Sequence, residues 1–276
     1  MTHGEMTDGE RWTGEVLREL RAKRYSPAAW IAFLAASFRR FAETRAAHRG
    51  AERQVMLLTA LGLVGAALLA VGRGAVAGTS TAAWWLAVML MVELHLGMLE
   101  RPDGTVLRTL SLPNLLSLVR AALVPPLLLA SPIVLAGLLA AAGATDVLDG
   151  FIARRFDLAT RLGQWLDGSV DAVVTGVASV ALVHLGLLPL WVAALVVARS
   201  LAPWIVIAAA YFLRAESPPQ EAFVPGRLPG VIALGGLIMI GAGVPAGVVF
   251  VVVGMIGGFA TFSASVVRAV RAGVRG

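Results

Sequence analysis

Four aspartates in a short stretch of this 276-residue chain have the spacing of a metal site. Asp146 and Asp149 are three residues apart, and Asp167 and Asp171 are four apart, so each pair shares one face of a helix. Converging carboxylates repel one another unless cations lie between them, and oxygen-rich clusters suit magnesium or manganese. The spacing predicts a divalent metal site, and the four histidines are too scattered to offer another.

Small residues and one arginine accompany these aspartates. Gly150 follows the second aspartate and Gly163 precedes the third by one helical turn, and a residue without a side chain lets a ligand approach the backbone closely. Ala153 keeps the same face small, and the planar fork of Arg154 suits a phosphate. These residues predict a nucleotide diphosphate pocket. The alternative is that the aspartates only pair with arginines between packed helices, which fits one aspartate better than four.

The chain that positions these residues is strongly apolar. Hydrophobic residues make up 58% of it and charged residues 14%, which is too much apolar surface for a soluble domain of this length. Apolar runs of about 20 residues predict membrane-spanning helices. We expect eight spans, placed near residues 55–73, 83–99, 112–130, 133–153, 162–184, 189–212, 229–244 and 246–266.

The distribution of positive charge predicts the orientation of these spans. With eight spans and a cytoplasmic N-terminus, the 23 lysines and arginines face the cytoplasm, apart from Arg73, Arg120 and Arg199. Both termini and all four aspartates then lie on the cytoplasmic side. Since the basic residues lie beside span ends, the net charge of +6 indicates anionic lipid headgroups and no nucleic acid partner.

The first 53 residues are polar and basic. They predict a cytoplasmic or interfacial segment that contains an amphipathic helix at the membrane surface. The alternative is a solvated helix with a few apolar contacts. The large apolar residues that recur at helical spacing and share one face are Trp30, Phe33, Leu34, Phe38 and Phe41.

The residues around the aspartates resemble the full signature of the CDP-alcohol phosphotransferases. The match reads Asp146-Val-Leu-Asp149-Gly150-Phe-Ile-Ala153-Arg154, eight residues, Gly163, three residues, Asp167, three residues and Asp171. Weaker resemblance extends over residues 108–270. The resemblance implies an all-α polytopic membrane protein with a six-helix core in 108–276. Two additional transmembrane helices in 54–107 and the amphipathic segment 1–53 would precede that core.

The resemblance also implies roles for single residues. Asp146, Asp149 and Asp167 would bind Mg²⁺ or Mn²⁺, with two ions in the site. Asp171 would complete the cluster and act as general base on the acceptor hydroxyl. Members of the family commonly form homodimers. The residues expected to bind CDP are Asn114, Ser117, Gly150, Ala153, Arg154, Thr160 and Gly163.

Three arginines bear on the acceptor. Arg120 and Arg199 lie inside spans, where arginine is rare, and we expect them to bind a phosphate of the acceptor or the substrate. The alternatives are snorkelling to the interface or pairing with an aspartate. Many relatives carry a Gly-Lys pair where this chain has Val231 at the lysine position, so Arg227 is expected to substitute. Ala172 also stands where many members have a basic residue, and the acceptor stays open.

We therefore expect an enzyme of the bacterial inner membrane that moves a phosphatidyl group from CDP-diacylglycerol to a polar hydroxyl and releases CMP. Glycerol 3-phosphate, an inositol phosphate, serine and phosphatidylglycerol are open as acceptors. One alternative is transfer of a CDP-linked headgroup to a lipid alcohol. Another, from a different class, is a cation-coupled transporter, although we find no internal repeat typical of transporters.

Overall fold

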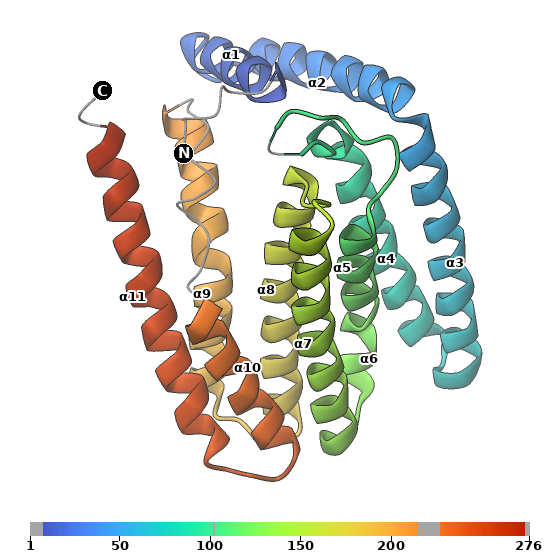
Figure 1. The fold of residues 1–276 in the computed structure, drawn as a ribbon, viewed down its shortest axis with the longest axis vertical. Helices are drawn as coiled ribbons and strands as arrows, with labels where there is room; N and C mark the ends of the chain where they lie inside the picture. Colours follow the sequence, from blue (N-terminus) through green and yellow to red (C-terminus); the bar gives the residue numbers. More distant parts are fainter. Residues whose placement is uncertain (1–7, 102, 215–226, 274–276) are drawn as a thin grey trace. The chain divides into compact units, whose positions relative to one another are not determined.

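The computed structural model describes residues 8–101, 103–214 and 227–273. Its regular structure there is helical, apart from one isolated antiparallel bridge between Glu100 and Val106 (Figure 1). The α-helices are α1 (Asp8–Ala22), α2 (Pro27–Ala47), α3 (Arg49–Arg73), α4 (Ala75–Leu94), α5 (Leu112–Ala122), α6 (Val124–Leu129), α7 (Pro132–Arg155), α8 (Arg161–His184), α9 (Leu190–Ala209), α10 (Arg227–Gly241) and α11 (Gly247–Gly273). A short 3-10 helix, η1 (Leu96–Met98), and a π-helical turn, η2 (Ala210–Arg214), complete the set.

Among the described residues, seven helical stretches are long and apolar enough to cross a membrane. The predicted fold class, an all-helical multi-pass membrane protein, is confirmed. The stretches are Arg49–Arg73, Ala75–Leu94, Leu112–Leu129, Pro132–Arg155, Arg161–His184, Leu190–Leu213 and Gly247–Arg268. The span predicted at 229–244 corresponds to α10, whose apolar part, Leu228–Gly241, is shorter than the other seven.

The second span differs most from its prediction, because α4 begins at Ala75 and ends at Leu94 rather than covering 83–99. The turn before it consists of Gly74 alone, whose φ of 95° is a backbone conformation that glycine adopts readily. Residues 75–82, which lie between the first two predicted spans, belong to α4. The hydroxyls of Thr79 and Thr81 donate to backbone carbonyls four residues earlier, so they need no water.

The chain forms two compact units. The first comprises the described residues up to Pro125 together with Asp146–Asp167. In it α3 and α4 pack side by side (Figure 1). A Cβ on Gly62 would collide with the indole ring of Trp85, whose Nε1 donates to the carbonyl of Leu58 at 2.9 Å. The indole Nε1 of Trp84 reaches the carbonyl of Ala121 at 2.9 Å and ties α4 to α5.

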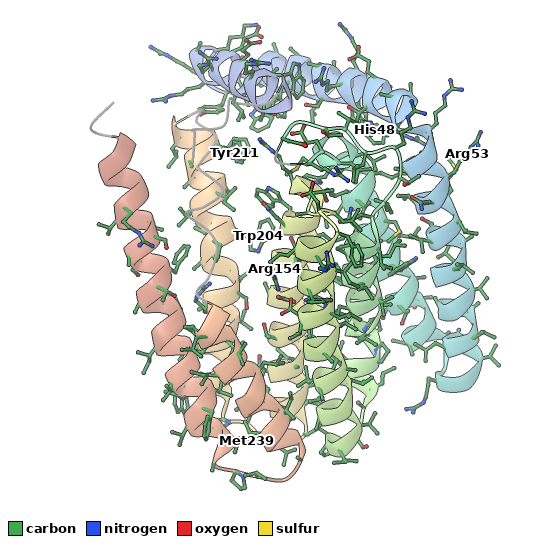
Figure 2. All side chains as sticks on the ribbon, in the orientation of Figure 1. His48, Arg53, Arg154, Trp204, Tyr211 and Met239 are labelled. Carbon is green, nitrogen blue, oxygen red and sulfur yellow. The ribbon has the colours of Figure 1, made fainter. Side chains whose placement is uncertain are left out.

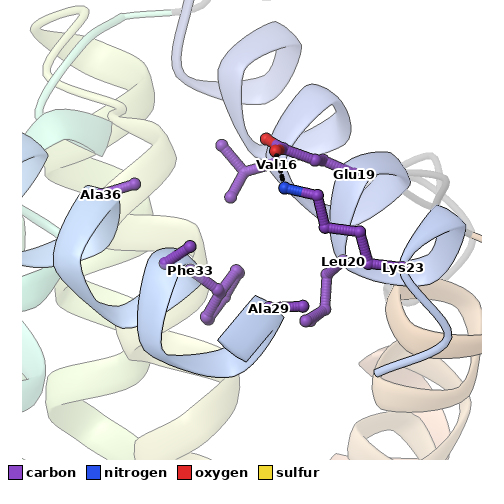
Figure 3. Close-up of a pocket in the computed structure, with 8 residues that line it drawn as sticks. Val16, Glu19, Leu20, Lys23, Ala29, Phe33 and Ala36 are labelled. Atoms are coloured by element: carbon purple, nitrogen blue, oxygen red, sulfur yellow. Dashed lines mark hydrogen bonds and ion pairs between the residues drawn. The ribbon is translucent and has the colours of Figure 1, made fainter. Parts of the chain in front are cut away.

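The helices α1 and α2 also belong to the first unit and pack against each other (Figure 3). The predicted apolar face of α2 is divided between two surroundings. Phe33 lines the pocket between the two helices, whereas Leu34 and Phe38 are 49% and 69% exposed. At the pocket, Lys23 pairs with Glu19 at 2.5 Å. The side chains lining this pocket are Val16, Glu19, Leu20, Lys23, Ala29, Ala32, Phe33 and Ala36.

The second unit comprises Pro126–Thr145 and the described residues from Gly168 onward. Its closest pair is α10 and α11, which glycines allow to approach at backbone distance. A Cβ on Gly236 would lie 2.6 Å from the carbonyl oxygen of Gly247, and one on Gly254 would lie 2.7 Å from the amide nitrogen of Ala233. Small-residue contacts of this kind are typical of helix packing in membranes. The helix α9 packs against α11 in the same unit.

Candidate active site

The structure brings together three of the four predicted metal ligands. Asp146 and Asp149 lie in the last part of α7, and Asp167 lies in the second turn of α8. One carboxylate oxygen from each can be chosen so that all three lie within 4.8 Å of one another. Asp149 is buried, and the other two are partly exposed. All three belong to the first unit.

Arg120 of α5 is the cation that these carboxylates share. Its side chain is 1% exposed. Its Nη1 lies 3.1 Å from Asp146 Oδ1, and its Nη2 lies 2.6 Å from Asp149 Oδ2 and also pairs with Asp167. A charge this deeply buried requires such partners. The contacts match the alternative weighed for Arg120, pairing with an aspartate, while contact with a substrate phosphate stays a prediction.

The charges within this cluster do not balance. Three carboxylates face one guanidinium, so the four side chains carry two negative charges in excess when all are ionised. The exposed parts of Asp146 and Asp167 leave oxygen ligands open to a further cation. Carboxylate oxygens are the donors that hard divalent cations prefer. The residues present therefore fit a divalent metal held by Asp146, Asp149 and Asp167.

Asp171, the predicted general base, lies four residues after Asp167 on α8 and belongs to the second unit. Its side chain is partly exposed. Its backbone carbonyl accepts a hydrogen bond from the hydroxyl of Thr175 at 2.7 Å. Its role as base stays a prediction.

The residues expected to contact CDP include a buried polar group where α8 begins. The hydroxyl of Thr160 donates to Asn114 Oδ1 at 3.2 Å and accepts from the amide of Gly163 at 2.9 Å, so Thr160 caps α8. Ser117 is buried on the same helix as Asn114. Asn114 is fully buried, yet its Nδ2 has no hydrogen-bond partner among the described residues. An orphaned buried donor of this kind is costly and suits a ligand that supplies an acceptor.

The two signature glycines clear space for protein groups. A Cβ on Gly163 would lie 2.7 Å from Asn114 Oδ1, so the glycine lets α8 approach α5. A Cβ on Gly150 would lie 3.2 Å from Nη1 of Arg154, an exposed side chain (Figure 2) that returns over the preceding turn. Ala153 is partly buried on the same helix.

Two of the three arginines expected at the acceptor lie in the second unit. Arg199 of α9 is 8% exposed, and its guanidinium lies 5.2 Å from the ring centroid of Phe262 on α11. Its Nε is buried without a hydrogen-bond partner in the described part of the chain. Gly258 on α11 makes room for it, because a Cβ there would lie 3.1 Å from that Nε. Arg227 begins α10, but its side chain lies outside the described residues.

Sequence reasoning missed one contact of the site. Glu100 and Arg161 form an ion pair at 3.3 Å, and Arg161 is the first residue of α8. The available signal was a pair of charges, Glu100 and Arg101, between the second and third predicted spans. Since charges beside span ends are ordinary in membrane proteins, the sequence offered no reason to single out Glu100 as a partner of Arg161.

Comparison with known proteins decides the family. The family model described as CDP-alcohol phosphatidyltransferase matches residues 110–263, which is more than half of the chain. The chain belongs to this family. The three aspartates, Arg120 and Arg199 all lie inside the matched region of the CDP-alcohol phosphatidyltransferases. The segment before residue 110 lies outside it.

Several curated relatives within the CDP-alcohol phosphatidyltransferase family are similar to part of the chain. A probable phosphatidylglycerophosphate synthase of Mycobacterium tuberculosis (strain ATCC 25618 / H37Rv) is 36% identical over 104 residues, which cover 34% of this chain and 50% of that protein. A probable cardiolipin synthase (CMP-forming) of Drosophila melanogaster is 35% identical over 123 residues, covering 41% of this chain and 36% of that protein. A CDP-diacylglycerol--glycerol-3-phosphate 3-phosphatidyltransferase of Pectobacterium atrosepticum is 46% identical over 77 residues, covering 25% and 42%. The chain spans half or less of the length of each of these relatives.

Proposed function

We propose that this protein transfers a phosphatidyl group from CDP-diacylglycerol to the hydroxyl of a polar acceptor and releases CMP. The observation that carries the proposal is the group of three converging aspartates inside the region that matches the family model. The name of one relative, CDP-diacylglycerol--glycerol-3-phosphate 3-phosphatidyltransferase, supports CDP-diacylglycerol as the donor. In the reaction the acceptor oxygen bonds to the phosphorus of the phosphatidyl group, and the bond from that phosphorus to the CMP oxygen breaks.

Asp146, Asp149 and Asp167 would hold divalent metal, Mg²⁺ or Mn²⁺. When bound, the metal supplies positive charge against the diphosphate oxygens and the departing CMP. The part of Arg120 is to hold the three carboxylates together, because its two terminal nitrogens contact all three of them. A preorganised cluster of this kind does not have to rearrange when substrate binds.

The general base in this proposal is Asp171. The acceptor hydroxyl is a weak nucleophile, and a nearby carboxylate takes its proton as the bond to phosphorus forms. Asp171 lies one helical turn beyond Asp167 on α8, and its partly exposed side chain leaves it open to an acceptor. CMP leaves with the electron pair of the broken bond.

Binding of the CDP moiety is assigned to the residues around the start of α8 and the end of α7. The support is the unsatisfied Nδ2 of Asn114, a buried donor that a ligand acceptor would satisfy. Arg154 is exposed and free to turn toward a phosphate. The full set assigned to CDP is Asn114, Ser117, Gly150, Ala153, Arg154, Thr160 and Gly163.

The acceptor is assigned to Arg199. Its buried guanidinium contacts an aromatic ring, and no described ion pair neutralises it, so an anionic acceptor group would supply the missing counter-charge. This favours an acceptor that carries a phosphate, such as glycerol 3-phosphate, an inositol phosphate or phosphatidylglycerol. Arg227 stays a predicted second contact. We place donor and acceptor at the cytoplasmic side of the membrane, in a homodimer.

The test is CMP release by the purified full-length protein in detergent or vesicles with CDP-diacylglycerol, Mg²⁺ and a panel of acceptors, with the lipid products identified by mass spectrometry. We expect CMP together with one new phospholipid, and no CMP from an Asp171→Asn variant. If the protein instead transfers a soluble CDP-linked headgroup to diacylglycerol, the alternative reaction is the correct one. If neither CDP-diacylglycerol nor a soluble CDP-linked headgroup yields CMP, the proposal is wrong and the transporter hypothesis is tested next.

A further inference from the structure

A small hairpin joins the additional N-terminal helices to the family region. In this linker hairpin, defined as residues 99–101 and 103–107, the amide of Leu107 donates to the carbonyl of Leu99 at 2.9 Å, and the amide of Arg101 donates to the carbonyl of Thr105 at 2.9 Å. Thr105 also donates its amide to Asp103 Oδ1 at 2.8 Å, and this bond lowers the pKa of Asp103. The hairpin is therefore an ordered element, and it precedes residue 110, where the family match begins.

The linker hairpin contacts the first residue of α8 by two routes. The backbone amide of Arg161 donates to the carbonyl of Glu100 at 3.0 Å, and its Nε lies 3.3 Å from Glu100 Oε1. The two side chains are 19% and 13% exposed, so water screens this pair only weakly. Glu100 also places its negative charge at the N-terminus of α8, the positive end of the helix dipole.

A second contact of the hairpin offers a contrast. Arg101 Nη1 lies 3.6 Å from Asp157 Oδ2, in the loop between α7 and α8. The Asp157 side chain is 80% exposed, so this pair is a surface contact of small energetic effect. It serves as a matched control for the partly buried pair of Glu100 and Arg161 in the same segment.

The start of α8 matters because three residues of the proposed site lie beside it or within the next two turns. Thr160 precedes Arg161, and Gly163 and Asp167 lie within the next two turns. Six residues of helix separate Arg161 from Asp167, or about 9 Å at 1.5 Å per residue. Leu162 and Leu166 are buried and hold this helix in the unit. Apolar packing tolerates small sliding, whereas a hydrogen bond and an ion pair fix a position more narrowly.

We propose that Glu100 and Arg161 form a positioning clamp. Through this clamp, the segment outside the family region holds Thr160 and Asp167 in the positions in which they bind the nucleotide of the donor. Neither Glu100 nor Arg161 touches substrate in this proposal. The inference rests on the proposed function, since it names residues that prepare the same site. The clamp would also give the linker hairpin, which joins the additional helices to the family region, a role in donor binding.

The experiment compares Glu100→Gln, Arg161→Gln, their double variant and Arg161→Lys with the wild-type full-length protein. We measure KM for CDP-diacylglycerol, KM for the acceptor, the Mg²⁺ concentration for half-maximal rate, CDP affinity by calorimetry and the melting temperature. The clamp predicts a KM for donor and a Kd for CDP raised about three- to tenfold in both Gln variants, with an unchanged acceptor KM. The double variant should be no worse than the worse single variant, and Arg161→Lys should recover part of the loss.

Three outcomes would overturn the clamp. The first is a lowered melting temperature with unchanged donor KM and CDP affinity, which means a structural role only. The second is additivity of the two Gln variants. The third is an equal effect of the control pair, Arg101→Gln and Asp157→Asn. A wild-type protein that binds CDP but releases no CMP refutes the proposed function instead, and the Kd values then still decide the clamp.

Discussion

The Nη2 of Arg120 lies 2.6 Å from Asp149 Oδ2, and both side chains are at least nine-tenths buried. The same nitrogen also pairs with Asp167. One guanidinium from α5 therefore fixes the ends of α7 and α8, the two helices that bear the signature residues. A single residue thus couples the folding of this unit to the assembly of its candidate metal site.

Replacing Arg120 should destabilise the protein strongly. Arg120→Gln leaves a buried carboxylate on Asp149 without its counter-charge, and breaking a buried pair typically costs about 3–5 kcal/mol. We expect a lower melting temperature in detergent and a larger stabilisation by Mg²⁺ than in the wild type, because the metal then has to compensate the carboxylates alone. A variant that melts like the wild type would contradict the central position given to Arg120.

Removing one metal ligand should weaken metal binding and lower activity without unfolding the protein. Asp167→Asn keeps the size of the side chain and removes one negative charge from a cluster with two in excess. We expect CMP release to fall by at least about 10²-fold and the Mg²⁺ needed for half-maximal rate to rise. The melting temperature without metal should stay near that of the wild type or increase. Full activity of this variant would remove Asp167 from the ligand set.

Gly163 and Gly168 provide a matched pair on α8. Gly163→Ala would place a Cβ 2.7 Å from Asn114 Oδ1, whereas a Cβ on Gly168 would meet nothing within 4 Å. We expect Gly163→Ala to cost about 1–3 kcal/mol and to raise the Kd for CDP. Gly168→Ala should be neutral or slightly stabilising, because alanine is the better helix former. Equal melting temperatures of the two variants would show that α8 adapts without strain at Asn114.

Arg199 should affect the acceptor alone. Arg199→Gln removes a buried cation that has no described anionic partner, so the protein should tolerate the change. We expect KM for a phosphate-bearing acceptor to rise at least about tenfold, which corresponds to about 1.4 kcal/mol, while KM for CDP-diacylglycerol stays the same. An unchanged acceptor KM would assign Arg199 to the packing of α9 against Phe262.

The sequence was sufficient where the signal was local and periodic. Apolar runs predicted most spans, and the spacing and placement of the aspartates predicted the convergence of Asp146, Asp149 and Asp167, while that of Asp171 stays a prediction. The α4 boundaries were wrong because Thr79 and Thr81 satisfy their hydroxyls within the helix, which composition does not show. The ion pairs of Arg120 with the aspartates depend on which faces of α5, α7 and α8 pack together, which the sequence alone does not show. The contact between Glu100 and Arg161 likewise joins residues about 60 positions apart, a distance at which periodicity carries no information.

The one-residue turn at Gly74 has a practical consequence for mapping the protein in its membrane. The exposed Val71 and Val76 lie on either side of this turn. Only Gly74 separates α3, which ends at Arg73, from α4, so Arg73 lies at the tip between two lipid-facing helices. The chain contains no cysteine. One cysteine introduced at Arg73 would therefore be the sole thiol, and its reaction with a membrane-impermeant maleimide in intact cells would report directly which side of the membrane this tip occupies.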